Sequence, residues 1–406
     1  MRPPAAWVDR IASSLAFYPP FPASYRIKRQ PDGRRELYVA PSRESRLPSC
    51  AFAEAALLPR DGGRKQVAAA LIPAPSSSLP GSACSTEKRR VILFAHGNAV
   101  DLAQQLPFLR ELSAALAKGG APCAVACFDY QGYGESRRVS PAEKDEEDDE
   151  RGRGGGERRN GGAGKSGASS CACDPPPSDA DAAALPRQAP LCPDHGAAPD
   201  STTADALLDG AAALAWLLEE KGFAPSEVVL YGQSLGSGVA TSLAVALCGR
   251  ERERLREEER RRRRQKKKGG GAAPTAAAGS APPPSSGGLA AAGLILHSPL
   301  ASGLRVLKPS WRFWPAALDI FPVARAAAKL SSPKGAGGAA GRMTKCLVIH
   351  GDADDVVPFD NGRAVFDALP AEARVEPLWV RGGGHCDLEG RAGFLPRLLK
   401  FLKDEI

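Results

Sequence analysis

The chain reads Val228-Val229-Leu230-Tyr231-Gly232-Gln233-Ser234-Leu235-Gly236 at the point that decides its fold. A short β-branched run ends in Gly-x-Ser-x-Gly, and small, apolar residues follow over 238–244. This pattern is typical of a strand that turns sharply into a helix with a serine at the corner. Glycines flank that serine because neighbouring chains pass too close to leave room for Cβ atoms. A serine hydroxyl is a poor nucleophile unless a base accepts its proton, so the rest of the chain must supply one.

Composition favours a globular protein with several low-complexity tracts. The 406 residues are 43% hydrophobic, which is enough for a sizeable core, and many of the 43 Gly and 36 Pro gather in a few stretches. Net charge is +8, and the segment 250–268 alone holds twelve Lys/Arg against five Glu, a balance of +7. Because the basic excess is local, a nucleic-acid-binding surface is not indicated and no nucleic-acid partner is expected.

The cysteines and the apolar runs bear on location. The ten cysteines have no regular spacing, and several lie in predicted buried strands, as free thiols do in a reducing compartment. No run is apolar and long enough to be a transmembrane segment, and the N-terminus lacks the pattern of a signal peptide. We expect a cytoplasmic protein, with peripheral residence on the cytosolic face of membranes as the alternative.

The ordered segments alternate between strand and helix. Continuous apolar strands, each followed by a helix, predict an α/β fold with a mostly parallel central sheet and helices on both faces. Residues 24–73 are expected to add antiparallel strands. The predicted strands are 90–95, 124–129, 228–233, 293–297, 345–350 and 375–380, and the predicted helices are 101–118, 203–221 and 394–404.

This order predicts one domain over 24–406, interrupted by low-complexity inserts at about 138–200 and 249–288. We expect both inserts to be disordered because they cannot bury enough apolar area to offset the entropy of ordering. The basic block in the second insert has three interpretations: a solvated loop, a nuclear signal, or a site for anionic lipid. Within the N-terminal segment 1–23, residues 7–17 are predicted to form a short helix that either docks on the core or associates with a membrane.

Two later strand ends supply an acid and a base. The strand ending near His350 continues to Asp354, with Asp352 and Asp355 as nearby alternatives, and the last strand leads through three glycines to His385. Serine, acid and histidine in this chain order are typical of the α/β-hydrolase fold. We predict that His385 takes the Ser234 proton and that Asp354 holds the imidazole in the correct tautomer.

The remaining site residues follow from the same chemistry. An oxyanion needs preorganised N–H donors, and the backbone of Leu235, at the start of a helix, and of Asn98, in the loop after the first parallel strand, are the candidates. Gln233, Trp311 and Trp314 are candidates for the substrate pocket; a small lid over 304–321 would give an acyl chain an apolar wall. Ordinary core packing explains these tryptophans equally well.

The other histidines and cysteines point to no further chemistry. His96, His297 and His350 also end strands, but one base suffices, so we interpret them as packing or turn residues. A Cys/His group in the first insert lacks any strand or helix to orient metal ligands. We predict no metal site and no cofactor.

Several strings resemble the α/β-hydrolase domain-containing protein 17 family, serine hydrolases that remove palmitate from cysteines of peripheral membrane proteins. The more specific strings are Asn98-Ala99-Val100-Asp101 and Glu376-Pro377-Leu378-Trp379. The matching strings lie at 94–102, 128–134, 230–234, 295–300, 348–351, 376–380 and 384–385. Family members carry a palmitoylated cysteine cluster near the N-terminus, whereas the first cysteine here is Cys50.

The resemblance implies a palmitoyl-protein thioesterase that acts through a Ser-His-Asp triad and an acyl-enzyme, with S-acylated proteins as substrates. Two alternatives stay open. A carboxylesterase or lysophospholipase would use the same tetrahedral intermediate, and a catalytically silent interaction protein would keep the fold alone.

Overall fold

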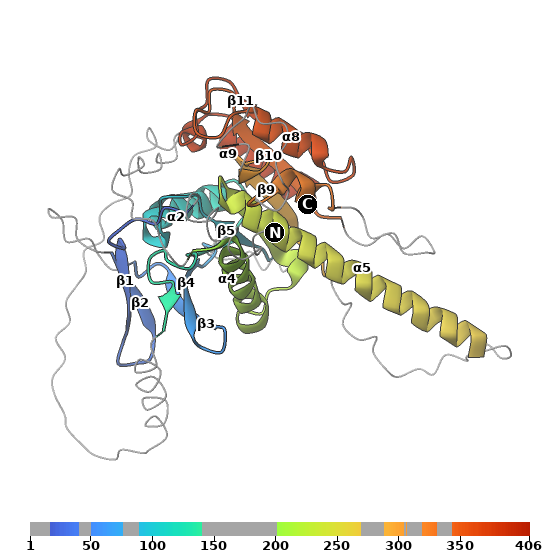
Figure 1. The fold of residues 1–406 in the computed structure, drawn as a ribbon, viewed down its shortest axis with the longest axis horizontal. Helices are drawn as coiled ribbons and strands as arrows, with labels where there is room; N and C mark the ends of the chain where they lie inside the picture. Colours follow the sequence, from blue (N-terminus) through green and yellow to red (C-terminus); the bar gives the residue numbers. More distant parts are fainter. Residues whose placement is uncertain are drawn as a thin grey trace, which may run out of the picture.

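A mixed β-sheet forms the centre of the molecule (Figure 1). The computed structural model describes residues 17–39, 50–75, 89–139, 201–268, 288–303, 306, 319–330 and 343–406. Within these ranges the strand order is β11-β10-β9-β8-β5-β6-β4-β3, with β7 beside β4. Its parallel strands are β5 (Val91–Ala95), β6 (Ala124–Phe128), β8 (Val228–Gln233), β9 (Gly293–His297), β10 (Lys345–Gly351) and β11 (Leu378–Val380). The predicted mostly parallel sheet is confirmed.

The N-terminal strands are antiparallel, as expected, but only some of them join the central sheet. At one edge β6 pairs with β4 (Lys65–Ile72), β4 with β3 (Glu54–Arg60), and the short β7 (Arg137–Arg138) with the start of β4. The strands β1 (Tyr25–Arg29) and β2 (Arg35–Val39) form a separate two-stranded sheet. At the other edge β11 is only three residues long, shorter than the predicted 375–380.

Helices cover both faces of the sheet. One face packs against α4 (Thr203–Ala215), α5 (Gly236–Lys268), α7 (Val323–Ala327) and α8 (Asp360–Ala368), and the other against α2 (Leu102–Lys118) and α9 (Phe394–Lys400). The last turns of α4 and α9 continue as Trp216–Glu220 and Phe401–Glu405. Asp101 starts α2 because its carboxylate accepts the Gln104 N–H while the Gln104 side chain accepts the Asp101 N–H.

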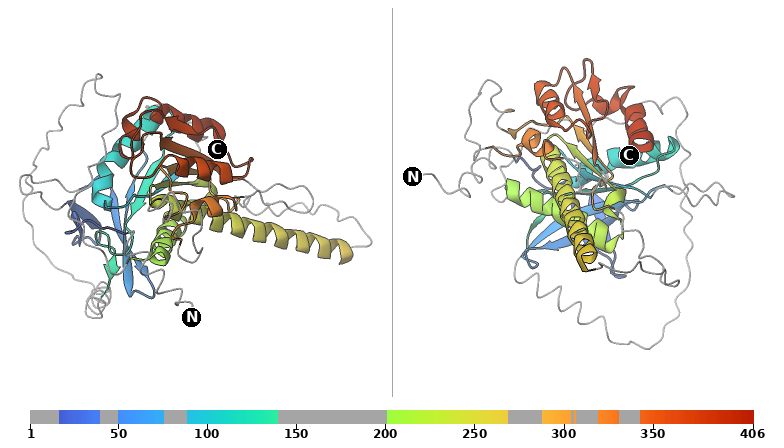
Figure 2. Two further views of the ribbon diagram at one scale, coloured as in Figure 1. Left: turned by 45° about the horizontal axis from the view of Figure 1, so that its top comes forward. Right: turned by 90° about the vertical axis from the view of Figure 1, so that its right-hand side faces the viewer.

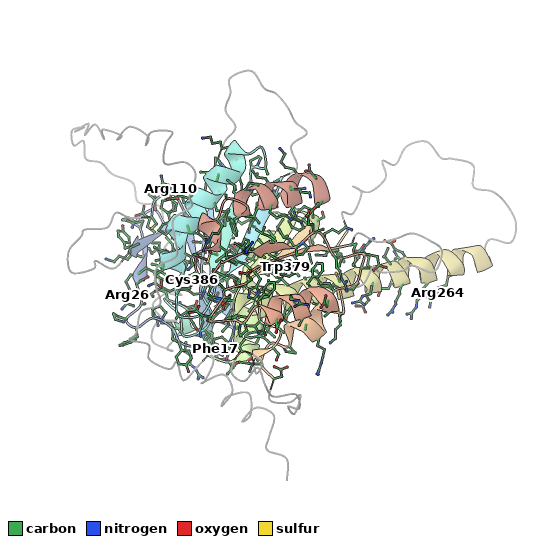
Figure 3. The ribbon with its side chains drawn as sticks, turned by 90° about the horizontal axis from the view of Figure 1, so that it is seen from above. Phe17, Arg26, Arg110, Arg264, Trp379 and Cys386 are labelled. Atoms are coloured by element: carbon green, nitrogen blue, oxygen red, sulfur yellow. The ribbon has the colours of Figure 1, made fainter. Side chains whose placement is uncertain are left out.

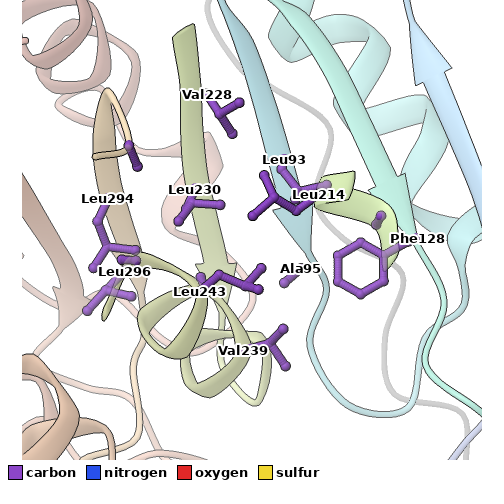
Figure 4. Packing of buried hydrophobic residues seen from close by; sticks show 14 of the residues in the cluster. Leu93, Ala95, Phe128, Leu214, Val228, Leu230, Val239, Leu243, Leu294 and Leu296 are labelled. Carbon is purple, nitrogen blue, oxygen red and sulfur yellow. The ribbon is translucent and has the colours of Figure 1, made fainter. Parts of the chain in front are cut away.

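Alternate side chains of each strand serve the two faces. In β5, Leu93 lies in the cluster that faces α4 and α5, whereas Phe94 lies in the cluster that faces α2. This is the period-two geometry of a strand buried on both faces. Figure 4 shows Val239 and Leu243 of α5 beside the strands that carry Leu230 and Leu296. The apolar start of α5 therefore fixes the serine turn to the sheet.

The distal half of α5 differs from the sequence prediction. The insert expected at 249–288 begins instead as a continuation of the helix to Lys268, and residues 269–287 lie outside the described ranges. The segment Arg250–Lys268 is here called the basic arm. It begins against the core, where the buried Glu251 accepts the Leu289 N–H at 2.9 Å, and its distal part projects from the rest of the molecule (Figures 1 and 2). Arg254 contacts Glu251 at 2.8 Å and Glu258 at 2.5 Å, spacings that stabilise a helix locally. Reasoning from apolar burial alone missed these pairs.

The N-terminal segment reaches the core at Phe17. Its ring is fully buried and lies edge-on to Tyr130, Tyr133 and Phe321, with centroid separations of 6.2–6.4 Å. Residues 1–16, which hold most of the predicted helix over 7–17, lie outside the described ranges, as do 140–200 of the first insert. Among the helices that the structure describes, none combines the length and apolar character needed to span a bilayer.

Candidate active site

The serine turn is strained and tightly packed. Ser234 has φ +50°, in the left-handed region that non-glycine residues rarely adopt, and its N–H donates to the carbonyl of His297 at 2.9 Å. A Cβ on Gly236 would lie 2.0 Å from the Ala95 carbonyl oxygen, and one on Gly232 would lie 2.4 Å from the Gly236 carbonyl oxygen. Both flanking glycines are therefore required by close backbone approach.

The structure brings Ser234, His385 and Asp354 together. His385 Nε2 lies 3.1 Å from Ser234 Oγ, and His385 Nδ1 lies 2.8 Å from Asp354 Oδ2. Ser234 follows β8, Asp354 follows β10 and His385 follows β11. The carboxyl ends of these parallel strands share one edge of the sheet, which is why residues 151 positions apart lie within hydrogen-bond distance. The imidazole of His385 therefore bridges the Ser234 hydroxyl and the Asp354 carboxylate.

Among the three neighbouring aspartates, the geometry selects Asp354. Its Oδ1 accepts hydrogen bonds from the N–H groups of Val356 and Val357, at 3.0 and 2.7 Å. The other oxygen, Oδ2, therefore faces the His385 imidazole. Burial alone would raise the pKa of Asp354, but the contacts with His350, His385 and the Val357 N–H together hold it below its usual value. Asp352 instead accepts the Gly382 N–H at 2.6 Å, and Asp355 is exposed.

His350, interpreted from sequence as a packing residue, also contacts the acid. Its Nε2–H donates to the Val357 carbonyl at 2.9 Å and lies 3.2 Å from Asp354 Oδ2. A Cβ on Gly362, in α8, would lie 2.3 Å from Nδ1 on the opposite side of the ring. His350 is therefore confined between the acid and a helix. Its spacing of four residues before Asp354 was the signal that sequence reasoning did not use.

The loop after β5 lies against the nucleophile. A Cβ on Gly97 would be in ordinary contact with Ser234 Cβ at 3.5 Å, and Ala99 has φ +60°. Asn98 Oδ1 accepts from Tyr133 Oη at 2.6 Å and from the N–H groups of Tyr18 and Ala99 at 2.9 and 3.0 Å. The Asn98 side chain is thus committed to holding this loop in place.

Leu235 lies at the other side of the nucleophile, in the turn that opens α5. The first N–H groups of a helix have no acceptor within the helix and are positioned for an anion. The loop carrying Asn98 and the turn carrying Leu235 thus lie on either side of Ser234. The roles of their N–H groups as oxyanion donors stay predictions.

Of the three predicted pocket residues, only Gln233 lies within the described ranges. Gln233 is 3% exposed, and its side-chain amide donates to Glu389 Oε1 at 3.3 Å, so it faces a buried carboxyl rather than an open pocket. Trp311 and Trp314 lie outside the described residues, as does most of the lid predicted at 304–321. Glu389 was not singled out from sequence, because a single glutamate after the histidine carries no recognisable pattern.

The remaining strand-end histidines are buried structural groups. The ring of His297 is fully buried, which lowers its pKa to about 3 and keeps it neutral at physiological pH. Its Nδ1 contacts Tyr231 Oη at 3.1 Å. His96 Nδ1 contacts the Gly97 carbonyl at 2.7 Å, and Nε2 lies 3.2 Å from Asp129. Neither imidazole contacts the Ser234 hydroxyl. No group of three or more His, Cys, Asp or Glu with metal-binding geometry occurs within the described ranges.

Sheet topology and site geometry together define a protein of the α/β-hydrolase fold. The resemblance to the α/β-hydrolase domain-containing protein 17 group is confirmed at the level of overall sequence. The mouse (Mus musculus) protein 17C is 28% identical over 325 residues, which cover 80% of this chain and 62% of the relative. The Xenopus tropicalis protein 17B is 26% identical over 404 residues, 98% of this chain and 92% of the relative. This chain therefore spans less than two thirds of the 17C relative.

Solved structures give a more distant comparison. A predicted CIB-like hydrolase from Thermoplasma acidophilum covers 86% of this chain and 97% of its own, with 14% identity and a TM-score of 0.40. A thermophilic esterase, Est2, from the Planctomycetes species Thermogutta terrifontis covers 87% and 91%, with 15% identity and a TM-score of 0.42. No family model matches the chain.

Proposed function

We propose that this protein is a serine hydrolase with Ser234 as nucleophile, His385 as general base and Asp354 as the acid that orients the base. One observation carries the proposal: the two ring nitrogens of His385 lie 3.1 Å from Ser234 Oγ and 2.8 Å from Asp354 Oδ2. A hydroxyl becomes an effective nucleophile when an adjacent base of this kind accepts its proton.

The reaction follows from this arrangement. Ser234 Oγ attacks the acyl carbon while its proton passes to His385 Nε2, and Asp354 stabilises the imidazolium through Nδ1–H. The oxyanion forms between the loop carrying Asn98 and the start of α5 at Leu235, where backbone N–H groups stabilise it. The leaving group departs with the proton from Nε2. Water then attacks the acyl-enzyme by the same route and frees the serine.

We further propose acyl thioesters of proteins, palmitoyl-cysteine above all, as the substrates. The support is the similarity to the protein 17 group, which covers nearly the whole chain in the comparison with protein 17B. Thioesters and oxygen esters pass through equivalent tetrahedral intermediates, so the triad does not discriminate between them. A lipid or small-molecule esterase is therefore the competing outcome of the substrate test.

The first experiment separates an enzyme from a silent scaffold. A fluorophosphonate probe should label the full chain at Ser234, and Ser234→Ala should abolish labelling while the circular dichroism spectrum stays unchanged. A folded wild-type protein that takes up no probe would refute the proposal of a serine hydrolase.

The second experiment compares substrates. Turnover of a palmitoylated cysteine peptide should exceed turnover of a lysophospholipid at equal concentration. The reverse preference would assign the enzyme to lipid esters.

The basic arm supports a proposal about the cytosolic surface on which such substrates reside. Its arginines include the exposed Arg256, Arg260 and Arg264, which follow one another at intervals of four along α5 (Figure 3 labels Arg264). Basic side chains on a projecting helix are attracted to anionic lipid, and the attraction is screened by salt. We propose peripheral, reversible contact of this arm with anionic membranes.

A further inference from the structure

A buried polar contact connects the loop that carries His385 with the residue that precedes the nucleophile. Glu389 lies in a short 3-10 turn, Leu388–Gly390, four residues after the histidine, and is only 2% exposed. Its Oε1 accepts a hydrogen bond from Gln233 Nε2 at 3.3 Å. Gln233 is the last residue of β8, so this contact joins the nucleophile strand directly to the histidine loop.

Both ends of this contact are firmly held. Leu388 is fully buried, and a Cβ on Gly383 would lie 2.5 Å from Leu388 Cδ2, so the loop packs closely on itself. Gly384 N–H donates to Asp387 Oδ1 at 2.7 Å on the other side of His385. On the strand side, Gln233 pairs with His297 in the parallel register of β8 and β9. The Gln233 side chain therefore has a rigid base from which to hold the loop.

Burying the Glu389 carboxyl costs folding free energy. Burial raises its pKa to about 7, and the His297 ring, whose Nδ1 lies 3.8 Å from Glu389 Oε1, is held neutral by its own burial. Tyr231 Oη contacts the same His297 nitrogen, and Tyr231, His385, Cys386 and Asp387 are titratable groups that interact electrostatically with Glu389. A buried carboxyl lowers stability unless its hydrogen bonds compensate, so a side chain kept here purely for packing would be apolar.

We propose that Glu389 is a positioning residue that fixes His385 over Ser234 by accepting the Gln233 amide. The inference rests on the proposed function, because it concerns how the base of that reaction is held. The His385 ring nitrogens face Ser234 Oγ and Asp354 Oδ2, so Glu389 acts on the base through the loop that carries it. An imidazole displaced by about 1 Å would slow a proton transfer by up to about a hundredfold.

The test compares Glu389→Leu, which cannot accept the amide, with Glu389→Gln, whose carbonyl can. The rate of fluorophosphonate labelling should fall at least about tenfold in Glu389→Leu and return to near the wild-type rate in Glu389→Gln. With a turnover substrate, kcat should fall while KM stays unchanged, because the residue touches no substrate. A structural role alone would lower the melting temperature and leave the labelling rate of the folded fraction unaltered.

A double-mutant cycle tests the same contact from the Gln233 side, so the conclusion does not rest on Glu389→Leu alone. Gln233→Leu should slow labelling as much as Glu389→Leu, and the double variant should be no slower than either, because both remove the same contact. Additive losses, or wild-type rates in both single variants, would overturn the inference while the serine hydrolase stood. If the wild-type protein takes up no probe, backbone amide hydrogen exchange tests the inference instead. Exchange over residues 382–391 should be faster in Glu389→Leu than in the wild type and unchanged in Glu389→Gln. Equal exchange rates in the two variants would overturn the inference.

Discussion

His350 lies beside Asp354, with Nε2 3.2 Å from the same carboxylate oxygen that faces His385. Two imidazoles therefore share one oxygen of the acid, while the other oxygen accepts two backbone N–H groups. These contacts fix the orientation of the Asp354 carboxylate. The contacts with His350 and His385 also help to hold its pKa below the usual value. This arrangement allows the contribution of each neighbour to be tested separately.

Asp354→Asn should reduce the labelling rate of Ser234 by about 10⁴-fold without loss of fold. The asparagine oxygen would stay on the Val356 and Val357 N–H groups, so its NH₂ group would face His385. The imidazole would then have to accept at Nδ1 and carry its hydrogen on Nε2, where it could no longer take the serine proton. Labelling kinetics measure the effect. Asp355→Asn, at an exposed neighbour, should match wild type, and equal losses at both positions would refute the assignment.

Gly362→Ala should destabilise the protein by about 1–3 kcal/mol and slow labelling, because the new methyl group needs the space of His350. Its Cβ would lie 2.3 Å from His350 Nδ1, and the Nε2 of the same ring lies 3.2 Å from Asp354 Oδ2, so moving the ring would disturb the acid. Gly393→Ala is the matched control, since a Cβ there meets its nearest neighbour at an ordinary 3.6 Å. Denaturant titration with parallel labelling measures both effects. The same behaviour in the two variants would contradict the role given to His350.

The buried carboxyl of Glu389 should make stability depend on pH. Its pKa rises from 4.5 to about 7 on folding, so the folded state holds a proton that the unfolded state has lost between these values. The stabilising effect of that proton is complete below pH 4.5 and declines as pH rises toward 7, by about 3 kcal/mol in all. The difference in unfolding free energy between wild type and Glu389→Gln, followed from pH 4 to 8, should show this slope. If this difference in unfolding free energy did not change with pH, the pKa of Glu389 would not be raised by folding.

Reversing the charge of Arg256, Arg260 and Arg264 to glutamate should weaken binding to vesicles containing phosphatidylserine by about tenfold or more. Binding of the wild-type chain should also fall as salt is raised, because exposed charges are screened. Vesicle co-sedimentation provides the measurement. The hydrolytic site should be unaffected, since α5 starts two residues after Ser234 and these arginines lie 20 or more residues along it, in the part that projects from the molecule (Figure 2).

The control for the arm reverses three exposed cations elsewhere, Arg325, Lys329 and Arg363. This variant carries the same net charge as the arm variant. Equal loss of binding in both would show that total charge, not the arm, attracts the membrane.

Much of the fold was predictable because it depends on local patterns. Buried parallel strands are continuous apolar runs, and Gly232 and Gly236 mark the serine turn by the absence of Cβ atoms. The proximity of Asp354 and His385 to Ser234 was predictable because parallel strands deliver the residues that follow them to one edge of the sheet. The separation of β1 and β2 from the central sheet was not predictable, because it depends on long-range pairing.

What sequence reasoning missed arises from contacts between distant loops. The contact of Gln233 with Glu389 joins residues 156 positions apart, and neither residue belongs to a motif that would indicate the other. The confinement of His350 by Gly362 likewise requires the placement of α8. The helical arm was missed for a different reason, because its ion pairs stabilise a helix without any apolar face.

Helix α5 begins two residues after Ser234 and continues for 33 residues, a rise of about 50 Å from the turn to its far end. An attachment at that end (a dye, a bead or a crosslink to a support) would therefore be held well clear of the triad. The far end of α5 offers a natural handle for single-molecule or immobilised assays of this chain, in which tethering and turnover would not interfere.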